Sequence, residues 1–198
     1  VRENALVLDP MCGSGTTSCE ALVSGRSAIG ADLNPLSVLV ATVKSAVVLE
    51  HPKIFFETVS GYIGKFRFKA FSPEKIWSRD DLSYLKRWFD PKAIRDLSAV
   101  LAEIKKVRKP LYRDFFRVCL SNIIRSVSWQ KDTDLRVRKE VRPYDSGTAI
   151  SRFKEEALEQ LDRIYPYLCV LPQSLIHPTL TIRRGNAVNI AEMFPEYQ

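Results

Sequence analysis

The stretch "LDPMCGSGTTSCEALVSGRSAIGADLNP", residues Leu8–Pro35, decides the fold of the first part of the chain. An apolar run ends at Asp9, a glycine-rich turn follows, and residues 16–24 have the pattern of a short helix. A second apolar run ends at Asp32. Strand, turn, helix and strand within about 30 residues predict a βαβ unit with parallel strands.

The pattern changes after this unit. Asn34-Pro35 is a typical cap and first-turn pair, so a helix is predicted to run on from there. Near residue 51, proline and aromatic residues predict a connecting stretch. Beyond it we expect helices over 91–107, 110–129 and 151–168, a polar loop over 130–147, and a strand, turn and short helix over 180–198.

These elements predict an α/β fold that is interrupted by a mainly helical insertion. The expected divisions are residues 1–50 for the βαβ part, 51–178 for the insertion, and 179–198 for the return to the α/β part. In the helix over 110–129, one apolar stripe is expected to face the core: Leu111, Phe115, Val118, Leu120 and Ile124.

Composition excludes several classes of site. The 198 residues include four scattered cysteines without a CxxC pair and only two histidines. A disulfide framework, a zinc site and a histidine-centred triad are therefore not expected. The expected location is the reducing cytoplasm. No apolar run approaches the roughly 18 residues of a membrane span, so a membrane is not expected as a partner. With so few cysteines and histidines, a metal is not expected either.

The net charge of +7 is concentrated in one segment. Residues 1–50 hold three basic and five acidic side chains, whereas residues 104–142 hold twelve Lys or Arg and four Asp or Glu. Such an excess is typical of a surface that binds a polyanion, although a solvated helical face stays open as the alternative. The expected phosphate contacts are Arg136, Arg138, Lys139 and Arg142. Trp129, beside them, is expected either to pack in the core or to stack on a base.

The glycine turn predicts a nucleotide-like ligand. A P-loop would need Gly-Lys-Ser/Thr, and a dinucleotide fingerprint a third small residue where Ser18 stands. Asp9 would repel a pyrophosphate but suits a ligand with a free ammonium group, and Asp32 is placed to accept from ribose hydroxyls. An adenosine joined to an amino acid, S-adenosylmethionine, meets these demands. The alternative is that the glycines only turn the chain.

"LDPMCGSGTT" followed by "GRSAIGADLNP" resembles the exocyclic-amino DNA methyltransferases, which methylate adenine N6 or cytosine N4. The resemblance implies a Rossmann-like, S-adenosylmethionine-dependent fold, double-stranded DNA as substrate and a role in restriction-modification; whether a restriction partner exists stays open. Met11 stands where the family has phenylalanine, and Cys12 is expected to be a packing residue, not a nucleophile. The implied cofactor-binding residues are Asp9, Pro10, Met11, Cys12, Gly13, Ser14, Gly15, Thr16, Asp32, Leu33, Asn34, Asn186 and Ala187.

Two further segments fit the resemblance. Gly185-Asn186 stands where the family has Gly-Asp, and the Asn186 amide oxygen is expected to accept from the adenine amino group; a simple turn is the alternative. In the insertion, Trp88-Phe89 and the segment from Phe115-Phe116 to Ser128 match the outline of a helical region in one subgroup.

The family grips its target amine with Asp/Asn/Ser-Pro-Pro-Tyr/Phe/Trp, and this sequence has no Pro-Pro pair. No residue is therefore assigned to catalysis. The expectation is a fragment or one half of a split enzyme, inactive alone, whose partner is the missing catalytic half. Two alternatives stay open: an RNA guanosine N2-methyltransferase, and a non-catalytic nucleic-acid-binding relic.

Overall fold

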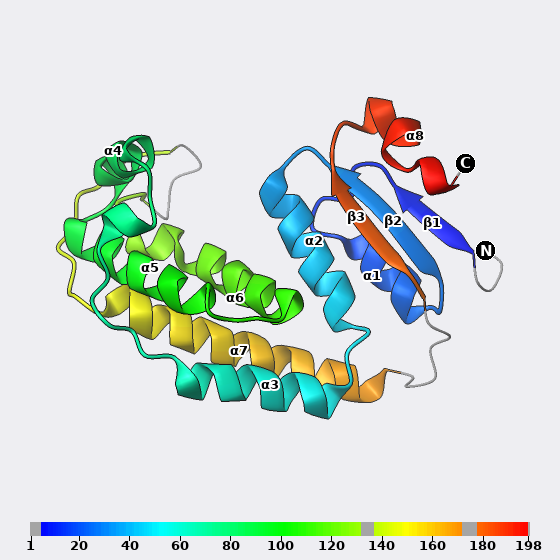
Figure 1. Ribbon diagram of the computed structural model, residues 1–198, viewed down its shortest axis with the longest axis horizontal. Helices are drawn as coiled ribbons and strands as arrows, with labels where there is room; N and C mark the ends of the chain where they lie inside the picture. Colours follow the sequence, from blue (N-terminus) through cyan, green and yellow to red (C-terminus); the bar gives the residue numbers. More distant parts are fainter. Residues whose placement is uncertain (1–4, 132–136, 172–177, 198) are drawn as a thin grey trace. The chain divides into compact units, whose positions relative to one another are not determined.

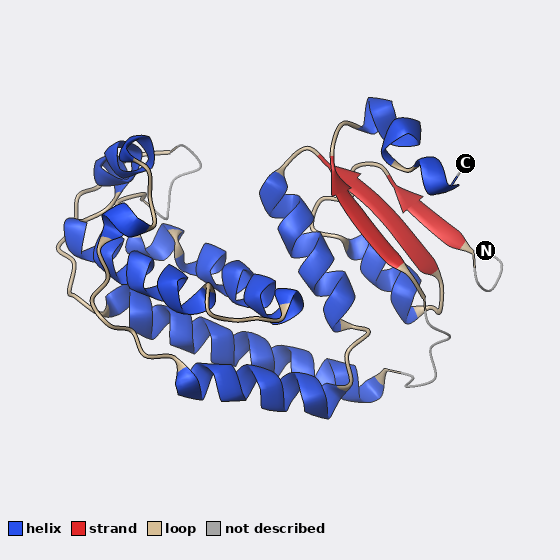
Figure 2. Cartoon of the chain, in the orientation of Figure 1, coloured by secondary structure: helices blue, strands red, loops and turns tan. Residues whose placement is uncertain are grey.

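The computed structural model describes residues 5–131, 137–171 and 178–197. The chain forms two compact units, one made of Val1–Phe56 with Ile164–Gln198 and the other of Glu57–Arg163 (Figures 1 and 2). The second unit is thus inserted in sequence between the two parts of the first. The divisions expected after residues 50 and 178 both fall within the first unit.

The first unit contains a parallel sheet of three strands, β1 (Leu6–Asp9), β2 (Ser27–Asp32) and β3 (Leu180–Arg184). Their order is β1-β2-β3, with Asp9 opposite Gly30 and Asp32 opposite Arg184. Because the strands are parallel, all three carboxyl ends lie at one edge of the sheet. The predicted βαβ unit and mixed α/β architecture are confirmed; the sequence separation between β2 and β3 is filled by the helical unit.

Helices lie on both faces of this sheet. α1 (Thr16–Val23) follows the glycine turn, and α2 (Pro35–Val47) begins after Asn34, whose side chain accepts from the Leu36 N–H at 2.9 Å. On the other face, Ile29 and Ala31 of β2 pack with Phe194, which follows α8 (Ile190–Met193). Alternate residues of β2 therefore face the helices on opposite sides of the sheet.

The second unit is helical. α3 (Pro52–Lys65) begins in the first unit and continues into the second, followed by α4 (Arg79–Trp88), α5 (Pro91–Ile104), α6 (Pro110–Ile123) and α7 (Thr148–Val170), whose last turns return to the first unit. The connecting stretch expected from about residue 51 is partly wrong, because α3 and α4 are helices; residues 66–78, which include the expected segment 71–77, do connect them. α4 starts with a capping box, in which the Ser78 and Asp81 side chains and backbone N–H groups bond reciprocally.

Aromatic side chains form the core of the second unit. Phe116 and Phe153 are fully buried, and Phe66 packs edge-on to Phe116 with ring centroids 4.9 Å apart. The expected stripe of α6 is partly wrong: Phe115 and Leu120 are buried, but Leu111, Val118 and Ile124 are only half-buried. The buried positions of α6 are Tyr112, Phe115, Phe116, Cys119, Leu120 and Ile123. Of the helices that the structure describes, none combines the length and the apolar character needed to cross a bilayer.

Candidate functional site

The residues expected to bind a cofactor lie at the carboxyl edge of the sheet, where three loops leave the strands. The loops are bonded to one another through the backbone of β2. The Cys12 N–H donates to Ala31 O at 2.9 Å, and the Gly185 N–H donates to Asp32 O at 3.0 Å. The turn after β1 and the turn after β3 are thereby both fixed to the end of the central strand.

The turn after β1 depends on two glycines with positive φ. Gly13 has φ of 50° and Gly15 has φ of 78°. A Cβ at Gly15 would lie 2.7 Å from both Cα and Cβ of Ala41 in α2, whereas a Cβ at Gly13 would meet nothing within 4 Å. Gly15 thus allows α2 to approach the turn closely, and Gly13 serves the backbone conformation alone.

Asp32 joins the turn to the second loop. Its Oδ2 accepts from the Gly13 N–H at 2.9 Å, and its Oδ1 accepts from the Asn34 N–H at 2.8 Å. A carboxylate offers about four lone-pair positions, so each oxygen retains capacity for a further donor. The side chain is only half-buried. Asp32 can therefore accept from a ligand while it holds the two loops together.

Apolar and acidic side chains flank this carboxylate. Met11 is 76% exposed and Leu33 is 64% exposed, which is high for side chains of this size. Asp9 is half-buried, and its Oδ1 accepts from the Met11 N–H at 3.2 Å. Pro10 is half-buried and Ser14 is exposed. The loops at this edge of the sheet thus carry two exposed apolar side chains, Met11 and Leu33, and two half-buried carboxylates, Asp9 and Asp32.

Cys12 packs beneath the turn. It is buried, and burial, followed by the charges of Asp32 and Asp9, raises the pKa of its thiol. The thiol is therefore held neutral, which suits a packing residue and not a nucleophile. A Cβ at Gly30 would lie 3.2 Å from the Cβ of Cys12, so the glycine of β2 makes room for this side chain.

Lys44 is a site residue that the sequence does not predict. From α2 its Nζ donates to Oγ1 of Thr16 at 3.2 Å, which places a cation at the start of α1. Gly15 is the N-cap of α1 and no side chain caps this end, so the first amides of the helix have no side-chain acceptor. No signal in the sequence joins these residues, because they are 28 positions apart. Together they favour an anionic group beside the turn.

The two expected asparagines serve as caps. Asn34 caps α2 through its side chain, and Oδ1 of Asn186 accepts from the Val188 N–H at 3.1 Å. The amide oxygen of Asn186, expected to face an adenine amino group, is thus used by the short helical turn that begins at Ala187. Its second lone pair remains an acceptor position. Arg184 links the same loops by donating from Nε to Leu33 O at 3.3 Å.

The predicted phosphate-binding residues lie in the second unit, on a short antiparallel pairing. Gln130 and Lys139 form a bridge, the Lys131 N–H donates to Arg138 O at 2.9 Å, and the Glu140 N–H donates to Trp129 O at 2.7 Å. The expected loop is thus partly paired. Arg138 and Lys139 are exposed, whereas Arg136 lies outside the described residues.

Arg142 and Trp129 have structural contacts in this pairing. The Arg142 guanidinium donates to Ser128 O at 3.2 Å and to Gln130 O at 3.1 Å, and the Trp129 indole N–H donates to Arg142 O at 3.2 Å. Lys139 Nζ lies 4.8 Å from the centre of the Trp129 ring. Trp129 is half-buried, so it neither joins the core fully nor presents an open face.

The pairing is fixed to the helices by a partly buried hydrogen-bond network. The Tyr144 hydroxyl donates to Oδ2 of Asp96 at 2.7 Å, the Gly147 N–H donates to the same oxygen at 2.7 Å, and the Ala149 N–H donates to the Tyr144 hydroxyl at 2.7 Å. Burial, followed by the hydrogen bond to Asp96, raises the pKa of Tyr144. The residues that follow the basic pairing are thereby tied to α5.

No group of three or more His, Cys, Asp or Glu side chains suited to a metal occurs among the residues that the structure describes.

Comparison with known proteins gives one distant relative. The chain is 25% identical over 133 residues to the type II methyltransferase M.MvaI of Kocuria varians. The aligned part covers 65% of this chain and 29% of that protein, so the chain spans less than a third of the relative. No family model matches the chain, and no solved structure matches it significantly. The similarity supports a relationship to methyltransferases.

Proposed function

We propose that this chain is the cofactor-binding part of an S-adenosylmethionine-dependent DNA methyltransferase that acts on an exocyclic amino group of adenine or cytosine. In this proposal the three-stranded sheet is part of a Rossmann-like fold, and the helical unit is its insertion. The observation that carries it is the edge of the sheet: a glycine turn bonded to a half-buried carboxylate that retains acceptor capacity. The distant similarity to a type II methyltransferase supports the same class.

The side chains at this edge fit the cofactor in parts. Asp32 would accept from the ribose hydroxyls, and the exposed Leu33 would pack on the adenine ring, with Asn186 as an acceptor for its amino group. At the other end, Asp9 would hold the ammonium. Lys44 and the first amides of α1 would hold the carboxylate of the methionine moiety.

S-adenosylmethionine, when bound, supplies a methyl group on a positively charged sulfur. The residues of this chain would bind and orient the cofactor, and the exposed side chain of Met11 would cover the apolar methionine stem. We assign no proton transfer and no contact with the target amine to any of them. The groups that grip the amine come, in this proposal, from another polypeptide or segment.

Duplex DNA is the proposed substrate. Its proposed contact is the short antiparallel pairing of residues 129–131 with residues 138–140. Arg138 and Lys139 are exposed and can each neutralise a phosphate, which fixes position without reading sequence. Arg142 is proposed to act mainly by shaping this pairing, since its guanidinium donates to two backbone carbonyls.

Titration calorimetry with S-adenosylmethionine tests the cofactor assignment. Asp32→Asn removes the negative charge and replaces one acceptor oxygen by a donor. It is expected to weaken binding about 10- to 150-fold, since a hydrogen bond to a charged group contributes about 1.5–3 kcal/mol. Glu20→Gln, an exposed acid on α1, is the matched control and should leave the affinity unchanged. A folded chain that does not bind the cofactor, or an Asp32→Asn variant that binds it equally well, contradicts the assignment.

Transfer of a labelled methyl group tests the reaction. With duplex DNA and a polypeptide that carries the amine-gripping motif, the label is expected in N6-methyladenine or N4-methylcytosine after digestion to nucleosides. Label in guanosine of transfer RNA instead would favour the RNA methyltransferase alternative.

A further inference from the structure

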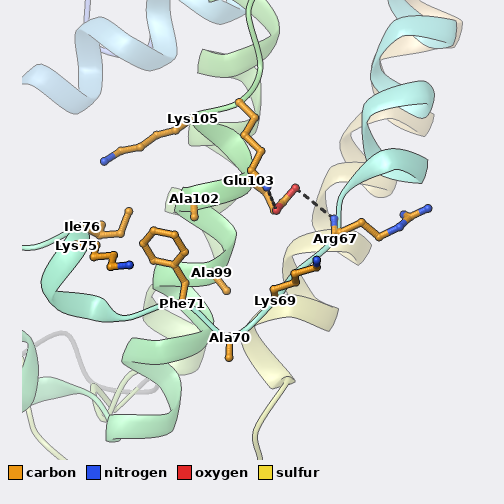
Figure 3. Close-up of a pocket in the computed structure, with 11 residues that line it drawn as sticks. Arg67, Lys69, Ala70, Phe71, Lys75, Ile76, Ala99, Ala102, Glu103 and Lys105 are labelled. Atoms are coloured by element: carbon orange, nitrogen blue, oxygen red, sulfur yellow. Dashed lines mark hydrogen bonds and ion pairs between the residues drawn. The ribbon is translucent and has the colours of Figure 1, made fainter.

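The second unit contains a pocket of about 560 Å³ between the segment Arg67–Ile76 and α5 (Figure 3). Its lining is unusually basic, with one acid, Glu103, and five cationic residues: Arg67, Lys69, Lys75, Lys105 and Lys106. Its floor is apolar and includes the ring of Phe71. The volume lies in the range of small-ligand sites, about 300–1,000 Å³.

Two of the cations are used within the protein. The Arg67 guanidinium donates to Gly64 O at 2.8 Å and to Phe66 O at 3.1 Å, and it points away from Phe71 (Figure 3). Lys106 pairs with the buried Glu103, whose other oxygen accepts from the Arg67 N–H at 3.2 Å. The carboxylate is therefore already neutralised, and it does not oppose an anion in the pocket.

The other three cations remain available. Lys69, Lys75 and Lys105 are exposed, and within the described ranges no carboxylate pairs with their ammonium groups. Lys75 Nζ lies 6.0 Å from the centre of the Phe71 ring. Figure 3 shows this ring between Ile76 and Ala99. A half-buried aromatic ring thus lies near one unpaired ammonium group, that of Lys75, in a pocket that Lys69 and Lys105 also line.

We propose that this pocket binds a nucleotide, with the base stacked on Phe71 and its phosphate held by Lys75 and Lys105. Aromatic rings beside cations bind nucleotides in this way without strong base preference. An inorganic anion would use the lysines but not the apolar floor, and an apolar ligand would leave three charges unpaired. The inference does not rest on the proposed methyltransferase function, because every residue in it lies between residues 67 and 106.

The nucleotide can be free or part of a single strand, and two thymidine probes distinguish these sources. Thymidine 5′-monophosphate is titrated by calorimetry, and a fluorescent ten-residue oligothymidylate by anisotropy; neither offers adenine to the sheet edge. Phe71→Ala should weaken binding roughly 5- to 150-fold, from the 1–3 kcal/mol of one base–aromatic stack. Lys75→Ala/Lys105→Ala should reduce the salt slope of oligonucleotide binding by about 0.7 for each phosphate that a lysine no longer neutralises.

Two controls separate binding from folding. Lys154→Ala removes an exposed lysine over another ring, that of Phe68 at 5.2 Å, outside the pocket, and should leave affinity unchanged. Phe71→Leu keeps an apolar side chain and should still lose most of the stacking, with an unchanged thermal melting temperature.

Each outcome decides the proposal. Binding of the monophosphate that depends on Phe71 supports a free nucleotide, and dependence seen with the oligonucleotide alone supports a strand. No binding of either probe overturns the proposal, as does binding that Phe71→Ala, Phe71→Leu and the double lysine variant leave unchanged.

Discussion

Gly15→Ala should destabilise the first unit strongly, because two costs act at one position. An L-residue in the left-handed region at φ of 78° costs about 1–2 kcal/mol. The new Cβ would also lie 2.7 Å from Cα and Cβ of Ala41, so α2 must move, and such overpacking costs about 1–3 kcal/mol. The expected loss in free energy of unfolding is therefore about 2–5 kcal/mol, a large part of the ~5–15 kcal/mol of a typical domain.

Gly13→Ala is the matched control, because its Cβ would meet nothing within 4 Å and only the backbone cost of about 1–2 kcal/mol applies. Amide hydrogen exchange of peptides from β2 and α2 reports opening of the first unit. Exchange should accelerate roughly 30-fold or more in Gly15→Ala and less in Gly13→Ala. Equal acceleration in the two variants would refute the reasoning, since the approach of Ala41 would then cost nothing.

Four further substitutions have defined outcomes. Asn34→Ala removes the cap of α2 and should cost about 1 kcal/mol in urea unfolding followed by circular dichroism. The raised pKa of Tyr144 means that the unfolded state loses this proton first, so the free energy of unfolding should fall as pH rises above about 10. Tyr144→Phe should lack that part of the slope. It should also cost about 1–3 kcal/mol at neutral pH, because Asp96 loses one of its two donors and the Ala149 N–H loses its acceptor. Arg142→Ala should lower the melting temperature, whereas Lys139→Ala should leave it unchanged and reduce the salt slope of duplex binding by about 0.9; the reverse pattern would contradict both roles.

The first strands and helices can be predicted because their signals are local. Asn34-Pro35 caps α2 within three residues, and the run ending at Asp32 forms β2 as expected. α3 and α4 escape prediction because proline and aromatic residues over 51–88 are equally typical of a connection. In fact Pro52 starts α3, where Phe55 and Val59 are buried on one face.

The site can be predicted only in part, because only some of its contacts join residues that are close in the sequence. The glycine turn and Asp32 belong to one motif, whereas Lys44 reaches Thr16 only through the packing of α2 against α1. Charge alone predicts a phosphate contact for Arg142; its carbonyl partners lie 12 and 14 residues away and depend on the antiparallel pairing.

Two residues at the sheet edge are expected to differ in how their loss affects stability and cofactor binding. Asp32 carries two backbone hydrogen bonds, so its loss should lower both the stability of the turn and the affinity for the cofactor. Lys44 has an exposed, flexible side chain with one long hydrogen bond to Thr16, and pairs of this kind contribute little to stability. If Lys44 holds the carboxylate of the cofactor, Lys44→Ala should weaken S-adenosylmethionine binding while the hydrogen exchange of α1 and α2 stays unchanged. If Asp32→Asn weakens binding but Lys44→Ala does not, Lys44 does not hold the cofactor carboxylate. The turn would then matter only because it positions Asp32 for the ribose contact.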